Sequence, residues 1–212
     1  VNKVSRNGFT PALVAAQNGH VEAIRALAKW GANFNAVTSQ GATAVYLATY
    51  FDKVEMVKVL GELGADANKA FSPSATPPIS VAAAKGSVAM IRALAAAGAN
   101  LNNMDGSLNS SVHDAAENGH TDALRAFADL GADLETIGSH TSPLLTALDG
   151  DYKKASTFLV RQGVTVVKCI QVSFPASVRT KHIRDKLQKF QSCISLVPSW
   201  EKDTDALCVL FS

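Results

Sequence analysis

Histidines and carboxylates are the residues of this chain that could carry acid–base or metal chemistry, but their arrangement indicates structural roles. His20 and His120 each follow an Asn-Gly pair, and such repetition is typical of a structural position. His140 has no metal-binding residue three or four positions further on, so it lacks the spacing of a helical metal site. Carboxylates such as Glu22 and Asp122 fall on the outward side of predicted helices. We therefore predict no enzyme activity, no cofactor and no metal site.

The cysteines and the overall charge favour an intracellular protein that binds neither nucleic acid nor membrane. The three cysteines have a spacing that matches no zinc motif, as expected for free thiols in a reducing compartment: Cys169, Cys193 and Cys208. The formal net charge of +2 is too small to indicate nucleic acid as the main partner. No stretch has the length and apolar character of a membrane span. We expect a cytoplasmic monomer without nucleic-acid or membrane contact.

A short pattern, Gly-Ala followed by Asn or Asp, recurs along the chain and marks a repeated unit. Its glycines, with one further glycine that continues the series, lie 33, 34, 33 and 32 residues apart: Gly31, Gly64, Gly98, Gly131 and Gly163. Each glycine follows a segment with helical apolar periodicity, and it supplies the left-handed residue that ends such a helix. A period of this length predicts a solenoid of stacked units.

A shorter helix is predicted before each of these helices. Thr10-Pro11 and Ser142-Pro143 place a capping side chain before a proline at the first helical position, where the missing N–H costs nothing. Alanine pairs close several short helices, and we interpret them as positions where neighbouring units approach closely: 15–16, 82–83 and 115–116. Each unit then consists of a short helix, a tight turn, a second helix and an extended excursion, and it buries its apolar side only by stacking.

Residues 10–35, TPALVAAQNGHVEAIRALAKWGANFN, resemble the ankyrin repeat, whose period is 33 residues and whose signature includes T-P-L-H-x-A. Four later copies extend the resemblance from residue 1 to about residue 163. It implies an all-α ankyrin-repeat solenoid of stacked helix-turn-helix units with extended hairpin-like excursions. We place the repeats at about 1–35, 36–68, 69–102, 103–135 and 136–163.

Two features depart from a regular family pattern, and the first residues predict a further repeat upstream. The signature histidine, which in the family ties neighbouring loops together, is retained only as His113, and Tyr46 is one of its replacements. Leu148 replaces the second small alanine of the fifth unit, so we expect a looser terminal unit. Aligning Val1-Asn2 with Phe34-Asn35 by one period predicts that at least one repeat precedes residue 1.

The pattern fades after Gly163, and residues 164–212 are assigned to a C-terminal extension. Pro175 lies 32 residues after Pro143, where a sixth repeat would begin, and residues 181–190 combine helical apolar spacing with basic residues. Three interpretations stay open: a degenerate sixth repeat that caps the stack, an unrelated extension that packs on it, or a disordered tail.

The family resemblance implies a concave face of short helices and excursions, on which such proteins typically bind other proteins. The excursions vary without loss of the scaffold, so they are natural contact positions. Tyr50 and Phe51 stand where other units have the polar pairs Gln17-Asn18 and Glu117-Asn118, and Phe71 is a further bulky excursion residue. The predicted partner-binding residues are Arg6, Phe9, Gln17, Trp30, Val37, Gln40, Tyr50, Phe51, Met104, Glu117 and His140.

Competing interpretations accompany these residues. Asp52 replaces the glycine of the turn between helices, so the second unit could be distorted and fold Tyr50 and Phe51 over its own turn. Phe9 and Trp30 could simply cover a neighbouring helix.

The sequence thus predicts a non-enzymatic module that binds another protein through the concave face of an ankyrin stack. The alternative function is a regulatory or targeting arm of a larger enzyme, channel or effector protein. A third is a module that touches a membrane or phosphate through residues 179–189.

Overall fold

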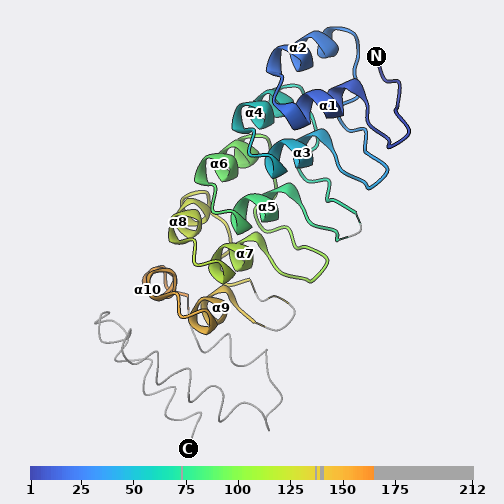
Figure 1. The fold of residues 1–212 in the computed structure, drawn as a ribbon. Helices are drawn as coiled ribbons and strands as arrows, with labels where there is room; N and C mark the ends of the chain where they lie inside the picture. The colour runs from blue at the N-terminus through green and yellow to red at the C-terminus, as the bar shows by residue number, and fades with distance from the viewer. Residues whose placement is uncertain (73, 137, 139–140, 165–212) are drawn as a thin grey trace, which may run out of the picture.

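The described residues fold into helix pairs stacked one on another, as the computed structural model in Figure 1 shows. The structure describes residues 1–164 apart from 73, 137, 139 and 140. The first helices of the pairs are α1 (Pro11–Asn18), α3 (Ala44–Tyr50), α5 (Pro78–Ala84), α7 (Ser111–Glu117) and α9 (Pro143–Asp149). The second helices are α2 (Val21–Lys29), α4 (Val54–Glu62), α6 (Val88–Ala96), α8 (Thr121–Asp129) and α10 (Lys153–Arg161).

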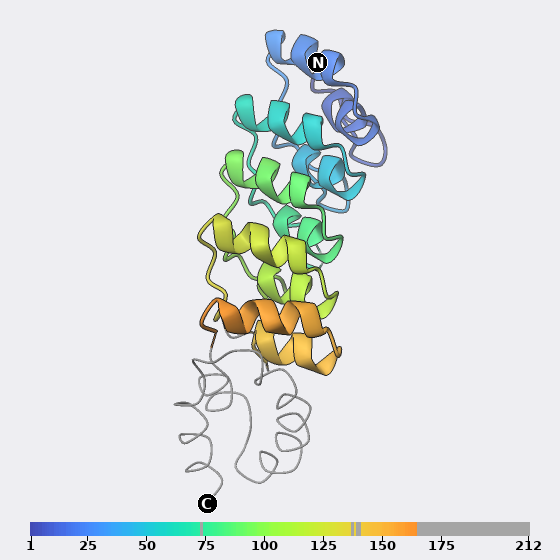
Figure 2. The ribbon, with the colours of Figure 1, turned by 90° about the vertical axis from the view of Figure 1, so that its left-hand side faces the viewer.

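The two kinds of helix form two layers, and the excursions extend from the side of the first helices (Figures 1 and 2). Each helix packs on its counterpart in the next pair, as α1 does on α3 and α4 does on α6. The described residues contain no β-strand, and two excursions are closed only by isolated bridges, Phe71 with Thr76 and Met104 with Ser110. The predicted all-α solenoid is confirmed.

The helix ends are formed by the predicted residues. Thr10 precedes α1 in an extended conformation and its side chain accepts a hydrogen bond from the Leu13 N–H, with Pro11 at the first helical position. Ser142 caps α9 in the same way. The glycines that follow the second helices all have positive φ, between 71° and 83°. Local capping therefore fixes the start of α1 and α9 and the end of each second helix before any packing is considered.

The stack is tight where the alanine pairs lie. Ala16, Ala83 and Ala116 are completely buried between neighbouring first helices. Larger side chains fill the space between the layers, among them Leu60 and Phe127, which are also completely buried. One continuous apolar core therefore runs through the described units, as expected for a solenoid whose single units cannot fold alone.

A ladder of asparagine side chains joins successive units at the start of the excursions. The backbone N–H of Asn33 donates to Asn2 Oδ1 at 2.9 Å, and Asp66 donates to Asn35 at 2.8 Å. The same bond recurs from Asn100 to Asn68 at 2.6 Å, and from Asp133 to Asn102 at 2.9 Å. Each unit thus satisfies a backbone donor of the next one, which fixes the register between units.

Several predictions concern residues beyond this description. The extension assigned to residues 164–212 and its three interpretations lie, from residue 165 onward, outside the described residues. His140 and the three cysteines lie outside them as well. Among the helices of the described ranges, none has the length and hydropathy needed to cross a membrane. The repeat boundaries and the upstream repeat stay predictions.

Candidate protein-binding surface

An open cavity of about 630 Å³ lies between the first two units on the side of the first helices. It is lined by the first excursion, by α1, by the second excursion, by α3 and by the third excursion. Five of the predicted residues line it: Phe9, Gln17, Gln40, Tyr50 and Phe51. The remaining walls are Asn7, Thr38, Ser39, Ala42, Tyr46, Leu47 and Phe71. We call this cavity the aromatic pocket.

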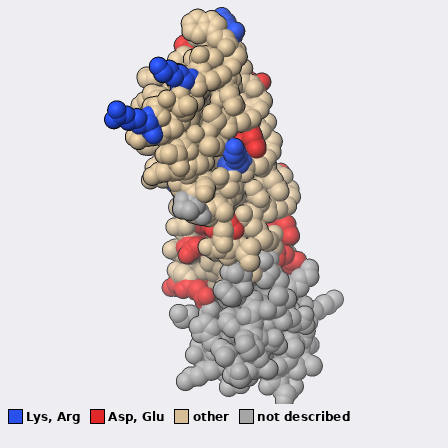
Figure 3. Space-filling model, turned by 90° about the vertical axis from the view of Figure 1, so that its right-hand side faces the viewer, with Lys and Arg blue, Asp and Glu red and all other residues tan. Residues whose placement is uncertain are grey.

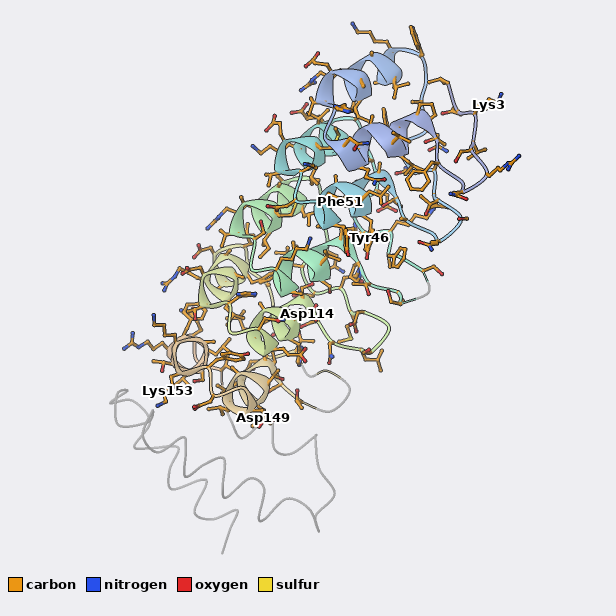
Figure 4. All side chains as sticks on the ribbon, in the orientation of Figure 1. Lys3, Tyr46, Phe51, Asp114, Asp149 and Lys153 are labelled. Atoms are coloured by element: carbon orange, nitrogen blue, oxygen red, sulfur yellow. The ribbon has the colours of Figure 1, made fainter. Side chains whose placement is uncertain are left out.

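Four aromatic rings in and beside α3 contact one another in this pocket. The Tyr46 ring stacks on Phe71 with centroids 4.7 Å apart and lies 6.3 Å from the Tyr50 ring. Tyr50 and Phe51 meet edge to face at 5.2 Å. Figure 4 marks Tyr46 and Phe51 in the second unit. Because the rings support one another, the pocket presents apolar surface of fixed shape.

Tyr50 and Phe51 are exposed because the turn that follows them has the same geometry as the turns of other units, where these positions face solvent. Their side chains are 52% and 43% exposed, respectively. Asp52 adopts the left-handed conformation, with φ 53°, that glycine has in other units. The Lys53 N–H donates to the Ala48 carbonyl at 2.7 Å, the bond that His20 makes to Ala15 in the first unit. The turn is therefore undistorted, and the interpretation in which distortion folds the rings over it is wrong.

A lysine from the third unit holds Tyr50 in place. The Lys85 ammonium lies 4.7 Å from the centre of the Tyr50 ring. The same group donates a hydrogen bond to the Tyr50 carbonyl oxygen. Tyr50 thus contacts a cation through both its ring and its backbone carbonyl, and it also lines the pocket.

Comparisons with known proteins agree with this architecture. Residues 1–71 match the family model described as ankyrin repeats (3 copies). Residues 1–71 belong to the ankyrin-repeat family. A search of curated proteins finds no significant match to the chain. The crystal structure of the human ASB11 ankyrin repeat domain is 24% identical, with a TM-score of 0.65. That match covers 74% of this chain and 71% of the other, so the ankyrin fold extends well beyond residue 71.

Ankyrin repeats are in general protein–protein interaction modules, so the pocket is considered as a place where another protein binds. It lies on the face formed by the excursions and the first helices, which we call the inner face (Figure 3). The pocket contains no Lys, Arg, Asp or Glu among its lining residues. Its wall combines aromatic rings with amide and hydroxyl groups. The rings suit an apolar side chain of a partner, and the polar groups suit the partner's backbone on either side of it.

The other predicted residues lie elsewhere on the stack. Val37 lines an adjacent cavity of about 540 Å³ together with Gln40 and Phe71. Arg6 is exposed in the first excursion and Met104 is 40% exposed in the fourth, both outside the pocket lining.

Glu117 and Trp30 are also away from the pocket. Glu117 lines a cavity of about 450 Å³ between the fourth and fifth units. Trp30 ends α2 in the layer of second helices and is 74% exposed, so it does not cover a neighbouring helix.

Tyr46 is a pocket residue that sequence reasoning missed. It occupies the position of the family's signature histidine, where a structural role is the default expectation. Its ring is only partly buried and it stacks on Phe71 from the next excursion instead of bonding to a loop. The available signal was the coincidence of an aromatic residue at the signature position with a bulky residue one excursion later.

His113 performs the loop-tying role expected from the resemblance. Its Nε2–H donates to the Thr141 carbonyl oxygen at 2.8 Å, and its Nδ1 lies 2.9 Å from Ser110 Oγ. Burial lowers the pKa of His113, although the bond to Thr141 opposes this shift. The neutral imidazole therefore links the fourth and fifth excursions as a structural group.

Asp114, the next residue on α7, is the most perturbed acid of the described chain. Burial, together with smaller contributions from the neighbouring carboxylates of Asp105 and Glu117, raises the pKa of Asp114 from 3.8 to about 7. A hydrogen bond from Ser80 opposes it, but Asp114 Oδ2 is buried without any partner. Within the described ranges, no three His, Cys, Asp or Glu side chains gather in a way that could hold a metal ion.

Proposed function

We propose that the chain is a non-enzymatic module that binds a partner protein through the inner face of its ankyrin stack, with the aromatic pocket as the main anchor. The observation that carries this proposal is the aromatic pocket itself, where Tyr46, Tyr50, Phe51 and Phe71 converge. A cavity whose wall exposes several aromatic rings is best explained by an apolar group that fills it.

The position of the pocket within the repeat supports binding rather than stability. Gln17 and Glu117 occupy the position of Tyr50 in other units, so the fold does not require an aromatic residue there. Tyr50 and Phe51 together leave large apolar rings half open to solvent. Aromatic residues of this kind dominate protein interfaces, where truncation of one typically costs about 2 kcal/mol or more of binding free energy.

The neighbouring excursions support a contact that spans several units. The pocket is built from three successive excursions and two helices, so a bound segment touches residues far apart in the chain. The adjacent cavity at Val37 shares Gln40 and Phe71 with the pocket and continues the hollow toward the excursion tips. A partner segment lying along the inner face therefore has room for more than one side chain.

The test is an affinity pull-down from the source cell with the wild-type chain and the double variant Tyr50→Ala/Phe51→Ala. We expect the wild type to recover partners that the double variant loses by roughly tenfold or more, as expected for a loss of ~2 kcal/mol. Trp30→Ala is the matched control, because it removes a larger exposed ring from the second-helix layer. Equal recovery by the wild type and the double variant would place the binding site elsewhere.

A further inference from the structure

The inner face carries opposite charges at its two ends. Its parts in the first three units, residues 1–18, 34–50 and 66–85, hold four basic residues and one acidic residue, namely Lys3, Arg6, Lys69, Lys85 and Asp66. Its parts in the last two units, 100–117 and 133–149, hold no Lys or Arg and six acidic residues, namely Asp105, Asp114, Glu117, Asp133, Glu135 and Asp149. Figure 3 shows blue side chains in the upper part of this face and mainly red ones below.

The charged groups at the two ends lie where a partner can reach them. Lys3 and Arg6 are exposed in the first excursion, above the pocket. Glu117 and Asp149 line the cavity between α7 and α9, and both are exposed. Figure 4 shows Lys3 at one end of the stack and Asp149 at the other. The contrast does not depend on Asp114, because five other carboxyl groups are present at the acidic end.

The aromatic pocket lies within the basic part and is itself uncharged. Arg6 is on the same excursion as the lining residue Phe9, and Lys85 contacts Tyr50. Asp52 and Lys53, in the turn after α3, carry opposite charges side by side. A segment anchored in the pocket therefore meets positive potential close to its anchor, and negative potential only two units further along.

We propose that the occupant of the inner face is an extended segment of the partner with three parts in a fixed order. An apolar side chain fills the aromatic pocket, acidic residues flank it, and basic residues follow toward Glu117 and Asp149. This inference rests on the proposed function and deepens it.

The expected spacing follows from the stack. Tyr50 at the end of α3 and Glu117 at the end of α7 lie two units apart. Neighbouring helices pack at about 10 Å, so this separation is roughly 20 Å, and an extended chain advances about 3.4 Å per residue. The basic residues are therefore expected about six positions from the apolar anchor.

The unequal charges also determine the direction in which the segment lies. A segment anchored in the pocket but placed the other way would direct its basic residues toward Lys3 and Arg6 and away from Glu117. Such like-charge contacts disfavour the reversed orientation and slow the encounter, whereas the complementary one is accelerated at low salt. The charges thus select register and direction, while the pocket supplies most of the affinity.

The test is a selection of displayed random peptides of about 16 residues, which span roughly 50 Å when extended, on the full 212-residue chain. Selected peptides are synthesised and measured against the wild type, Tyr50→Ala/Phe51→Ala, Glu117→Lys and the control Trp30→Ala. We expect an apolar residue with adjacent acids and with bases about six positions away. Glu117→Lys should weaken binding about two- to fivefold, and added salt should remove this difference.

The possible failures of the two proposals can be told apart. Selected peptides that need Tyr50 and Phe51 but show no ordered charges, or are unaffected by Glu117→Lys, overturn the charge order and leave the proposed function intact. Peptides that bind the double variant as well as the wild type overturn both proposals. A selection without any binder refutes an extended segment as the occupant, whereas the pull-down still reports on the pocket.

Discussion

Asp114 makes the stability of the stack depend on pH in an unusual direction. Its Oδ2 is buried without a partner, and Asp105 and Glu117 disfavour its charged form further. Together these effects raise the pKa of Asp114 from 3.8 to about 7. A carboxyl group that is neutral in the folded state and charged in the unfolded state reverses the usual behaviour of acids in proteins.

The size and sign of the effect follow from linkage. Each pKa unit corresponds to about 1.4 kcal/mol, so the shift at Asp114 amounts to about 4 kcal/mol. The folded state holds the proton more tightly, so the contribution is fully present below pH 3.8 and is lost as the pH rises to about 7. His113, whose pKa is lowered by burial, has the opposite slope, since stability falls as its unfolded form takes up a proton below pH 6.5.

The assay is urea unfolding of the wild type and Asp114→Asn between pH 4 and pH 8. Asparagine resembles the protonated acid in shape, and the contribution of His113 is largely common to both proteins. We expect equal stability near pH 4 and a variant that is more stable by about 4 kcal/mol at pH 8. Glu22→Gln is the control, because it removes an exposed carboxyl group from the second-helix layer.

A constant difference between the wild type and Asp114→Asn across this range would refute the reasoning. So would a wild type that becomes more stable than the variant at high pH, because that result requires a charged Asp114 with favourable partners. Glu117→Gln provides a second check on the cause. Removing this negative neighbour should narrow the difference at pH 8, whereas a pure burial effect leaves it unchanged.

Three further predictions concern single substitutions that change stability. Asp52→Gly should raise the free energy of unfolding by about 0.5–1 kcal/mol in thermal unfolding, because glycine adopts the left-handed conformation freely. Only an exposed hydrogen bond from Ser87 is lost, and a destabilised variant would contradict this prediction. Asn68→Ala should lower stability by about 1 kcal/mol in urea unfolding, because the Asn100 N–H loses its acceptor, and an unchanged midpoint would show that water replaces it. Ala83→Leu should cost about 1–3 kcal/mol by overpacking between units, and Ala83→Ser, nearly the same size, should cost less.

The sequence was informative wherever a feature repeats with the period. Thr10 and Pro11 predicted the start of α1, and the glycines after the second helices predicted where those helices end, since both signals act within one turn of the chain. The exposure of Tyr50 was also predictable, because equivalent positions in other units hold polar residues. These are local or periodic properties, and stacking leaves them unchanged.

Features built between units could not be predicted in the same way. The contact of Tyr46 with Phe71 joins residues 25 positions apart, and the presence of two bulky residues one excursion apart does not show that their rings meet. The unpaired Oδ2 of Asp114 depends on what the packing of α7 leaves beside it.

The asparagine ladder has a consequence for how such a chain can change length. Every rung joins an asparagine to a backbone donor in the next unit, 31 or 32 residues later, as Asn35 is joined to Asp66 and Asn68 to Asn100. Deletion of residues 36–68 would bring Asn35 into the place of Asn68, facing the same donor at Asn100. The shortened chain would keep the rungs and caps of the remaining units but lose α3 and, with it, Tyr46, Tyr50 and Phe51. Whole units can therefore be duplicated or lost while the scaffold persists. A single such event changes the residues that are available to contact a partner.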